Sequence, residues 1–181
     1  MLAGFQSELC LRNNAVMTEL AALKIFSSPI GRIAVGSTEI GVATLEILIA
    51  GQSKAEFSNS PKAHKITLDA IDRLGSYFDG STKSLEIETD LAGTEFQQAV
   101  WGAIAKLEFG QITTYAEIAQ SIGNPKAVRA VGGAVGANPV PLIIGCHRVL
   151  GSNRKITGYS GGEGIPTKRW LLEHEQISYV Q

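Results

Sequence analysis

The sequence of 181 residues contains only two cysteines and three histidines, and this shortage excludes several classes of protein. Two cysteines are too few for a disulfide framework, and no CxxC pair or spaced Cys and His set is present to build a zinc site. We therefore expect a cytoplasmic protein with no metal and no cofactor. The cysteines are Cys10 and Cys146, and His147 directly follows the second.

Long apolar runs are also missing, although 44% of the residues are hydrophobic. No segment approaches the roughly 18 apolar residues that a transmembrane helix needs. The first residues lack the basic start, apolar stretch and cleavage site of a signal peptide. We expect a globular protein of one domain or two small ones that is neither inserted in a membrane nor secreted.

Acidic residues are absent from a long internal stretch, although the formal net charge is −1. None lies between Glu117 and Glu163, whereas five basic residues do: Lys126, Arg129, Arg148, Arg154 and Lys155. Such a face would approach a phosphate backbone without repulsion. On composition alone, a glycine-rich loop region that happens to lack carboxylates explains the pattern equally well.

The first half of the chain has the pattern of a small α/β unit. Residues 1–17 show no clear periodicity and are treated as an extension of unclear role. Short β-rich runs at 23–26, 32–35 and 42–48 predict an antiparallel meander. Helical spacing from Ile66 to Phe78 predicts a helix, and alternation over 85–89 predicts an edge strand. We place this N-terminal domain at residues 18–92, and none of its residues forms a recognisable catalytic group.

Residues 93–181 predict a mainly α C-terminal domain with a helix-turn-helix. The sequences TEFQ at 94–97 and TYAE at 114–117 are capping boxes and predict two helix starts. Asn124 and Pro125 are expected to begin a third helix, from Lys126 to about Ala137. The second and third helices are separated by a short turn, as is typical of a helix-turn-helix.

The third of these helices has few long side chains. Its sequence KAVRAVGGAVGA contains three glycines, each of which costs about 1 kcal/mol relative to alanine in a helix interior. Close packing against another element, or close approach to a sugar-phosphate surface, would each explain that cost. Because Lys126 and Arg129 are its only long polar side chains, we expect binding in the minor groove with little sequence preference.

The dipeptide Cys146-His147 is the first chemical clue, although it is a weak signal on its own, and an apolar run at 140–144, predicted to be a strand, leads to it. A nearby His helps to form a reactive thiolate. Adjacent side chains rarely point the same way, so His147 would need a local turn or a bridging water. Glu173 and Glu175, in a predicted final helix, are both candidates to orient His147. A buried cysteine beside a structural histidine is the alternative interpretation.

Together these segments resemble the O6-alkylguanine-DNA alkyltransferases, also called methylated-DNA–protein-cysteine methyltransferases. The likeness runs through FQQAVW at 96–101, FGQITTYAEIA at 109–119, GNPKAVRAVGGAVGANPVP at 123–141, CHRV at 146–149, GYSGG at 158–162 and KRWLLEHE at 168–175. It covers nearly everything from residue 93 onward. It is weaker over residues 23–92 and absent from the leading segment.

The resemblance implies DNA repair by direct damage reversal, in which Cys146 takes an alkyl group irreversibly from guanine O6 after the nucleotide is flipped out. His147 would act through water as the base that generates the thiolate, and Glu175 would orient it. Asn138 would hold the turn, and Tyr115 would assist the departing guanine. Activity toward O4-alkylthymine and the choice between duplex and single-stranded DNA stay open.

The resemblance also implies the binding residues. The pocket would be lined by Tyr115, Val149, Tyr159 and Ser160. Arg129 would fill the gap left by the flipped nucleotide, and the other expected DNA contacts are Asn124, Lys126, Gly132 and Ser152. The implied partner is alkylated DNA, bound by a monomer, with no membrane involved.

Two features depart from the family pattern. Gly145 stands where the family usually has proline, so we expect a looser turn and slower transfer. The loop at 161–170 looks about two residues longer than usual.

Three other functions would each need a different sequence. A non-enzymatic relative that only binds alkylated DNA would lack Cys146, and a helix-turn-helix regulator would need base-reading side chains. A Cys-His hydrolase would need an oxyanion arrangement, and none is obvious.

Overall fold

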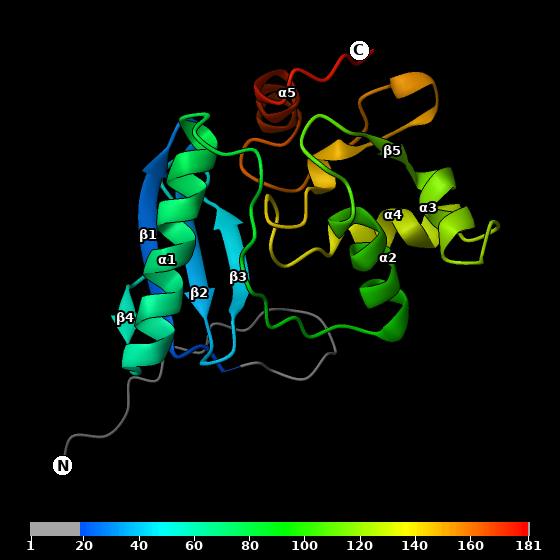
Figure 1. Cartoon of the computed structure of the whole chain (residues 1–181). Helices are drawn as coiled ribbons and strands as arrows, with labels where there is room; N and C mark the ends of the chain where they lie inside the picture. Colours follow the sequence, from blue (N-terminus) through cyan, green and yellow to red (C-terminus); the bar gives the residue numbers. More distant parts are fainter. Residues whose placement is uncertain (1–18, 181) are drawn as a thin grey trace.

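A computed structural model describes residues 19–180, so the extension at residues 1–17 lies outside the described part of the chain. The first half is a sheet with a long helix across one face, and α2, α3 and α4 lie beyond its β3 edge (Figure 1). The last helix, α5 (Ile165–His174), lies at one end of the molecule, at the top of Figure 1. The predicted class, a small antiparallel sheet with a helix followed by a mainly helical part, is confirmed.

The sheet has the strand order β3-β2-β1-β4, and neighbouring strands are antiparallel. Gly31, the first residue of β2 after a two-residue turn, has a φ of 108°, which glycine adopts without steric cost. The predicted meander is confirmed. β4 has two residues, too few to show alternation in the sequence. The strands are β1 (Ala22–Ser28), β2 (Gly31–Ser37), β3 (Val42–Ile47) and β4 (Phe57–Ser58).

Helix α1 (Pro61–Phe78) packs across β1 and β2. Ser60 caps its start by accepting a hydrogen bond from the backbone N–H of Ala63, and Pro61 occupies the first turn. The predicted helix is confirmed. Its buried face includes Ala70, Leu74 and Tyr77, so its last turn places Tyr77 in the interior.

The second half contains three helices that pack against one another, α2 (Glu95–Ala105), α3 (Tyr115–Ser121) and α4 (Val128–Gly136). Both predicted capping boxes are present, with Thr94 and Thr114 each accepting a backbone hydrogen bond at 3.2 Å. Just before α3, β5 (Thr113–Thr114) pairs in parallel with β6 (Val149–Leu150). This pairing ties the start of α3 to the segment that follows Cys146.

The predicted edge strand at 85–89 is wrong. These residues make a single bridge, between Thr89 and Val42, beside the start of β3. Further along that edge, the N–H of Leu45 donates to the carbonyl of Pro139 at 2.8 Å. The second half therefore takes the backbone position that a full edge strand would need.

The predicted strand at 140–144 is also wrong, because this segment is a turn. Leu142 has a φ of 79°, in the left-handed region, and Pro141 has no N–H to donate to a ladder. Asn138 holds the segment at both ends: its side chain accepts from the N–H of Val140 at 3.1 Å and donates to the carbonyl of Ile144 at 2.8 Å.

The predicted start of the third helix is wrong by two residues. α4 begins at Val128 with Ala127 at its N-cap, and no side chain caps it, so Asn124 does not play that role. Residues 124–127 instead form a turn closed by the N–H of Ala127 and the carbonyl of Asn124, 2.9 Å apart. The fixed φ of Pro125 suits the second position of such a turn.

One hydrophobic core runs through both halves. Its buried members include Val35 and Leu74 from the first half and Val100, Val131 and Leu171 from the second. The division at residues 92 and 93 therefore stays a prediction. Among the described residues, no helix is long and apolar enough to cross a membrane.

Candidate active site

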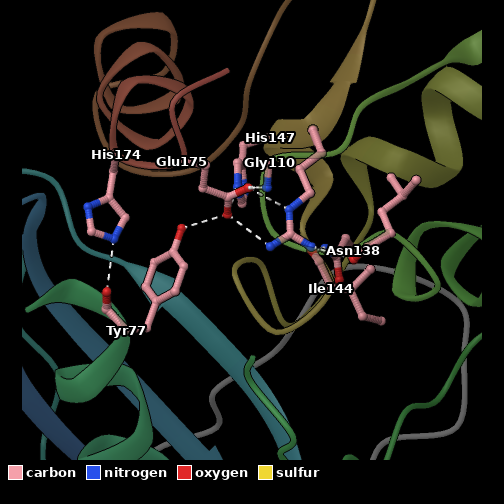
Figure 2. Close-up of polar contacts among 9 residues, drawn as sticks. Tyr77, Gly110, Asn138, Ile144, His147, His174 and Glu175 are labelled. Carbon is pink, nitrogen blue, oxygen red and sulfur yellow. Dashed lines mark hydrogen bonds and ion pairs between the residues drawn. The ribbon is translucent and has the colours of Figure 1, made fainter. Parts of the chain in front are cut away.

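Cys146 lies at the start of a short 3-10 helix, η1 (Cys146–Arg148), and only 5% of its surface is exposed. Its N–H donates to the carbonyl of Ile144 at 2.7 Å, the same carbonyl that accepts from the Asn138 amide. Figure 2 shows Asn138 beside Ile144. The structure therefore places Asn138 where it fixes the turn immediately before Cys146.

His147 and Glu175, at the end of α5, are in contact. The Nε2 atom of His147 is 2.9 Å from the Oε1 atom of Glu175, and both side chains are buried (Figure 2). The other ring nitrogen, Nδ1, is buried and has no hydrogen-bond partner among the described residues. Glu173, the alternative orienting residue, is exposed and accepts from Tyr179.

The Glu175 carboxylate also accepts hydrogen bonds from three other groups. The guanidinium of Arg148 donates to both oxygens, at 2.8 and 2.9 Å. The hydroxyl of Tyr77 donates to Oε1 at 2.8 Å, and the N–H of Gly110 donates to Oε2 at 3.1 Å (Figure 2). Such saturation satisfies a buried carboxylate and fixes its orientation.

These contacts set the charge state of the pair. Burial alone would raise the pKa of Glu175, but the hydrogen bonds from His147 and Arg148, together with the Arg148 charge, outweigh it and hold that pKa well below its usual range. Burial lowers the pKa of His147, and the raising effect of Glu175 does not fully offset it. At neutral pH the pair is thus an ionised carboxylate and a neutral imidazole.

The Cys146 thiol is surrounded by groups with opposing effects. Burial raises its pKa, against the lowering effects of the Asn138 amide, the Lys168 charge and the Tyr159 hydroxyl. Lys168 is 1% exposed, and its ammonium donates to the carbonyl of Val149 at 2.6 Å. Burial lowers the pKa of Lys168 to about 8. Within residues 19–180 it has no carboxylate partner, and the nearby group that can carry a negative charge is Cys146.

The predicted pocket residues Tyr115, Val149 and Ser160 lie at the start of α3, directly after η1 and in the loop at 158–162. Tyr115, at the start of α3, has its hydroxyl 3.0 Å from that of Thr157. The Ser160 hydroxyl donates to the carbonyl of Gly136 at 3.4 Å, which ties the loop at 158–162 to the end of α4. This loop, Asn138 and β3 together line a pocket of about 240 Å³, and the loop also contacts β3 directly, where the N–H of Gly162 donates to the carbonyl of Ile47 at 3.2 Å. Val149 is buried directly after η1.

The outer face of α4 is exposed and nearly bare. Arg129, Ala130, Gly133 and Gly136 point outward, and a Cβ added at either of these glycines would meet no described residue within 4 Å. Packing inside the chain therefore does not require them. Gly132 faces the Tyr115 ring at ordinary contact distance.

The other predicted DNA contacts, Asn124, Lys126 and Ser152, are exposed as well. Arg148, one of the five basic residues in the acid-free stretch, is not available to phosphate, because it is buried against Glu175. Among the described residues, no group of three or more His, Cys, Asp or Glu side chains is placed to hold a metal ion.

Comparison with known proteins identifies the family. Residues 95–177 match the family model described as 6-O-methylguanine DNA methyltransferase, DNA binding domain. The chain is 40% identical over 161 residues to the methylated-DNA–protein-cysteine methyltransferase of Haemophilus influenzae, and the aligned region covers 86% of this chain and 86% of the relative. It is 42% identical over 152 residues to that of Methanosarcina acetivorans, spanning 83% of this chain and 96% of the relative. The chain belongs to the methylated-DNA–protein-cysteine methyltransferase family.

A solved structure supports the same assignment. The crystal structure of Mycobacterium tuberculosis OGT in complex with DNA has a TM-score of 0.73 and 40% identity to this methyltransferase, and it covers 85% of this chain and 92% of that chain. The resemblance and the enzyme class that the sequence predicts are confirmed.

The structure shows what Gly145 contributes to this methyltransferase. Its φ of −67° is the value that proline imposes, so the backbone already has the shape that suits the usual family residue. A Cβ at this position would lie 3.0 Å from the Cδ and Nε atoms of Arg148. A side chain here would therefore press on the group that holds Glu175.

Three residues of the site are missing from the sequence prediction. Arg148 follows the Cys-His pair, but its basic character suggests phosphate binding rather than burial. Lys168 has no local signal of burial, because it follows Pro166-Thr167 at the start of a helix with mixed polarity. Tyr77 lies 98 residues from Glu175, and nothing near it in the sequence indicates chemistry.

Proposed function

We propose that this methyltransferase repairs DNA by moving the alkyl group of O6-alkylguanine onto Cys146, once per protein molecule. The observation that carries the proposal is the buried His147 next to Cys146, with one ring nitrogen on Glu175 and the other without a partner in residues 19–180. The family assignment supplies the reaction class, and the residue roles below extend it to this chain.

The proton balance follows from the charge states. An ionised Glu175 can only accept, so Nε2 of His147 carries the proton and Nδ1 has a free lone pair. Adjacent side chains rarely point the same way, so Nδ1 takes the thiol proton of Cys146 through a bridging water. Lys168 stabilises the thiolate that forms, since the buried ammonium has no carboxylate partner among the described residues.

In the transfer step, the sulfur attacks the alkyl carbon, the bond from that carbon to O6 breaks, and its electron pair stays on guanine. Tyr115 donates a proton or a hydrogen bond to the departing base, and the proton that His147 took from the thiol passes through solvent to neutralise the guanine anion or the Tyr115 phenolate. The product is a neutral thioether on Cys146 and unmodified guanine in DNA. A thioether has no ready route back to a thiol, so each molecule reacts once.

DNA binding is assigned to the surface of α4. The bare helix, with glycines that no internal packing requires, suits close approach to a shallow minor groove. Arg129 projects from it and would occupy the space left by the flipped nucleotide. Asn124, Lys126, Gly132 and Ser152 would contact the backbone of DNA bound by one protein molecule. The flipped base would lie against Tyr115, Val149, Tyr159 and Ser160.

A single-turnover reaction on a duplex oligonucleotide with one O6-methylguanine tests this function. Nucleoside chromatography after complete digestion should show one lesion converted to guanine per wild-type molecule. Cys146→Ala should convert none, whereas Cys10→Ala should match the wild type. Conversion of many lesions per molecule, or any conversion by Cys146→Ala, would contradict the proposal. Lesion binding without conversion by the wild type would favour a role in lesion recognition alone.

A further inference from the structure

Tyr77 of the first half contacts the Glu175 carboxylate at the oxygen that also accepts from His147. Its hydroxyl donates to Oε1 at 2.8 Å, and His147 Nε2 lies 2.9 Å from the same atom (Figure 2). Among the described groups that donate to Glu175, Tyr77 is the one that comes from the first half; the others are His147, Arg148 and Gly110.

A second contact joins the same tyrosine to the same end of α5. The Nε2 atom of His174 is 2.9 Å from the backbone carbonyl of Tyr77 (Figure 2). A carbonyl can only accept, so His174 carries its proton on Nε2. Two consecutive residues therefore bind Tyr77, Glu175 at its side chain and His174 at its backbone.

The tyrosine ring has little freedom to move. It is 1% exposed and meets the rings of Phe78, Phe109 and His174 at centroid distances of 5.3, 6.1 and 4.9 Å, all edge-on. A phenol held by packing is a pre-organised donor, and it loses little side-chain entropy when it bonds Glu175. The hydroxyl is therefore a fixed constraint on the position of Oε1.

We propose that Tyr77 is a positioning residue for alkyl transfer: its hydroxyl holds the Glu175 carboxylate in place for His147, so helix α1 is part of the proton-accepting relay. The inference rests on the proposed function. It adds that the relay is assembled from both halves of the chain, although the second half contains every residue that the motifs mark.

Removing the hydroxyl has two expected consequences. Without this donor, Oε1 keeps more of its negative charge for His147, so the titration midpoint of His147 moves upward. The carboxylate also loses one charge-assisted hydrogen bond that fixes its position for His147, so we expect transfer to slow by roughly tenfold. The charged groups that act on His147 are Glu175, Arg148 and Lys168, and Cys146 precedes it in the chain.

The test compares full-length Tyr77→Phe with Tyr179→Phe, which removes the same hydroxyl–carboxylate contact at the exposed Glu173. Nitrogen-15 spectra of labelled histidine, assigned with His64→Gln and His174→Gln, follow the His147 midpoint without any DNA. Single-turnover kinetics measure transfer. Tyr77→Phe should raise the midpoint and slow transfer, and Tyr179→Phe should change neither. A wild-type midpoint and rate in Tyr77→Phe would overturn the proposal.

A double-mutant cycle separates positioning from packing. If Tyr77 acts through Glu175, Tyr77→Phe should slow transfer in the wild type but should add little in Glu175→Gln. An equal slowing in both backgrounds would assign Tyr77 a packing role and overturn the inference. If the wild type transfers no methyl group, the proposed function fails, and the His147 midpoint still decides whether Tyr77 acts on the relay.

Discussion

The second half of the chain carries its chemistry in short motifs, whereas the first half reaches the same site through one tyrosine that no motif marks. Cys146, His147 and the bare helix α4 are visible in the sequence as residue types at fixed spacings. Tyr77 is an ordinary buried aromatic residue on a helix face, and only the fold brings it to Glu175. The difference shows that motifs reveal the reacting groups but not every residue that holds those groups in position.

The two halves also differ in the energetic role of their buried polar groups. In the first half, the buried polar side chains besides Tyr77 are uncharged hydroxyls, those of Ser37, Thr38, Thr44, Ser60 and Thr67. Around α5 the buried core contains an ion pair, an imidazole and a lysine, which are expensive to bury unless each is partnered. We call the contact between Tyr77 and Glu175 the seam between the two halves. Stability and chemistry are therefore most tightly linked at this seam.

The largest effect is expected from Glu175→Gln, which breaks the seam between the halves. The change leaves Arg148 as an uncompensated buried cation, so the free energy of unfolding at pH 7 should fall by about 3–5 kcal/mol. Transfer should fall by roughly 100-fold as His147 loses its ionised partner. Urea unfolding and single-turnover kinetics measure the two effects. Glu173→Gln is the matched control, and equal behaviour of the two variants would refute the role given to Glu175.

That carboxylate also predicts a pH dependence. Because the pKa of Glu175 is lowered in the folded state, its stabilising contribution is present above the normal carboxyl pKa and is lost as the pH falls through the folded value. The stability of the wild type should therefore decline more steeply in acid than that of Glu175→Gln. Parallel acid unfolding curves for the two proteins would contradict this.

Arg129→Ala changes the second half alone and should leave the seam intact. The arginine is exposed, so the melting temperature should stay within about a degree of the wild type, since surface changes are usually near neutral. Transfer from duplex DNA should fall by roughly 100-fold, because flipping a base costs a few kcal/mol. Transfer from the free base O6-methylguanine should not change. Lys62→Ala, on α1 in the first half, is the control, and an equal loss there would refute the assignment of α4.

Lys168→Met tests the buried lysine by its pH signature. The pKa of Lys168 is lowered to about 8 by burial, so the unfolded chain holds this proton more tightly. Stability should therefore rise by about 2 kcal/mol between about pH 7.5 and 9.5 through this group, and the rise should disappear in the variant. Lys65→Met, an exposed lysine, should keep it. Identical pH profiles for wild type and Lys168→Met would contradict the assignment.

The smallest effect is expected at Gly145, and two substitutions there separate two causes. Proline fits the observed φ and should restrict the unfolded chain, so Gly145→Pro should be more stable than Gly145→Ala by about 0.4–1 kcal/mol. Both variants place a Cβ against Arg148, so their difference isolates the ring constraint. Gly145→Pro should also transfer faster than Gly145→Ala, because both carry the Cβ that presses on Arg148 and only proline restricts the turn before Cys146. Equal rates for the two variants would contradict the looser turn expected from Gly145.

Much of the fold could be predicted from local sequence because local physics determines it. The capping boxes of Thr94 and Thr114 and the periodic face of α1 need only neighbouring residues, and they are confirmed. The incorrect predictions of secondary structure occur where contacts between residues far apart in the sequence determine the backbone. Residues 85–89 alternate like a strand, but Pro139 occupies the edge they would use, and residues 140–144 are turned by the Asn138 side chain.

The site divides in the same way. Cys146 and His147 are adjacent, and Glu175 is one of two carboxylates at the end of the last helix, so residue types narrow the choice. Arg148 and Lys168 reverse the usual expectation that basic residues face solvent, because each finds a partner that only the folded chain supplies. Tyr77 requires the packing of α1 against α5, which no pattern in either helix indicates.

The most direct test of the account is the mass of the intact protein after reaction with a duplex that contains O6-methylguanine, followed by peptide mapping. We expect a gain of one methylene mass per molecule, found on the peptide with Cys146 and absent from Cys146→Ala. A modification on Cys10 or on several residues, or an unchanged mass after the DNA is repaired, would contradict it.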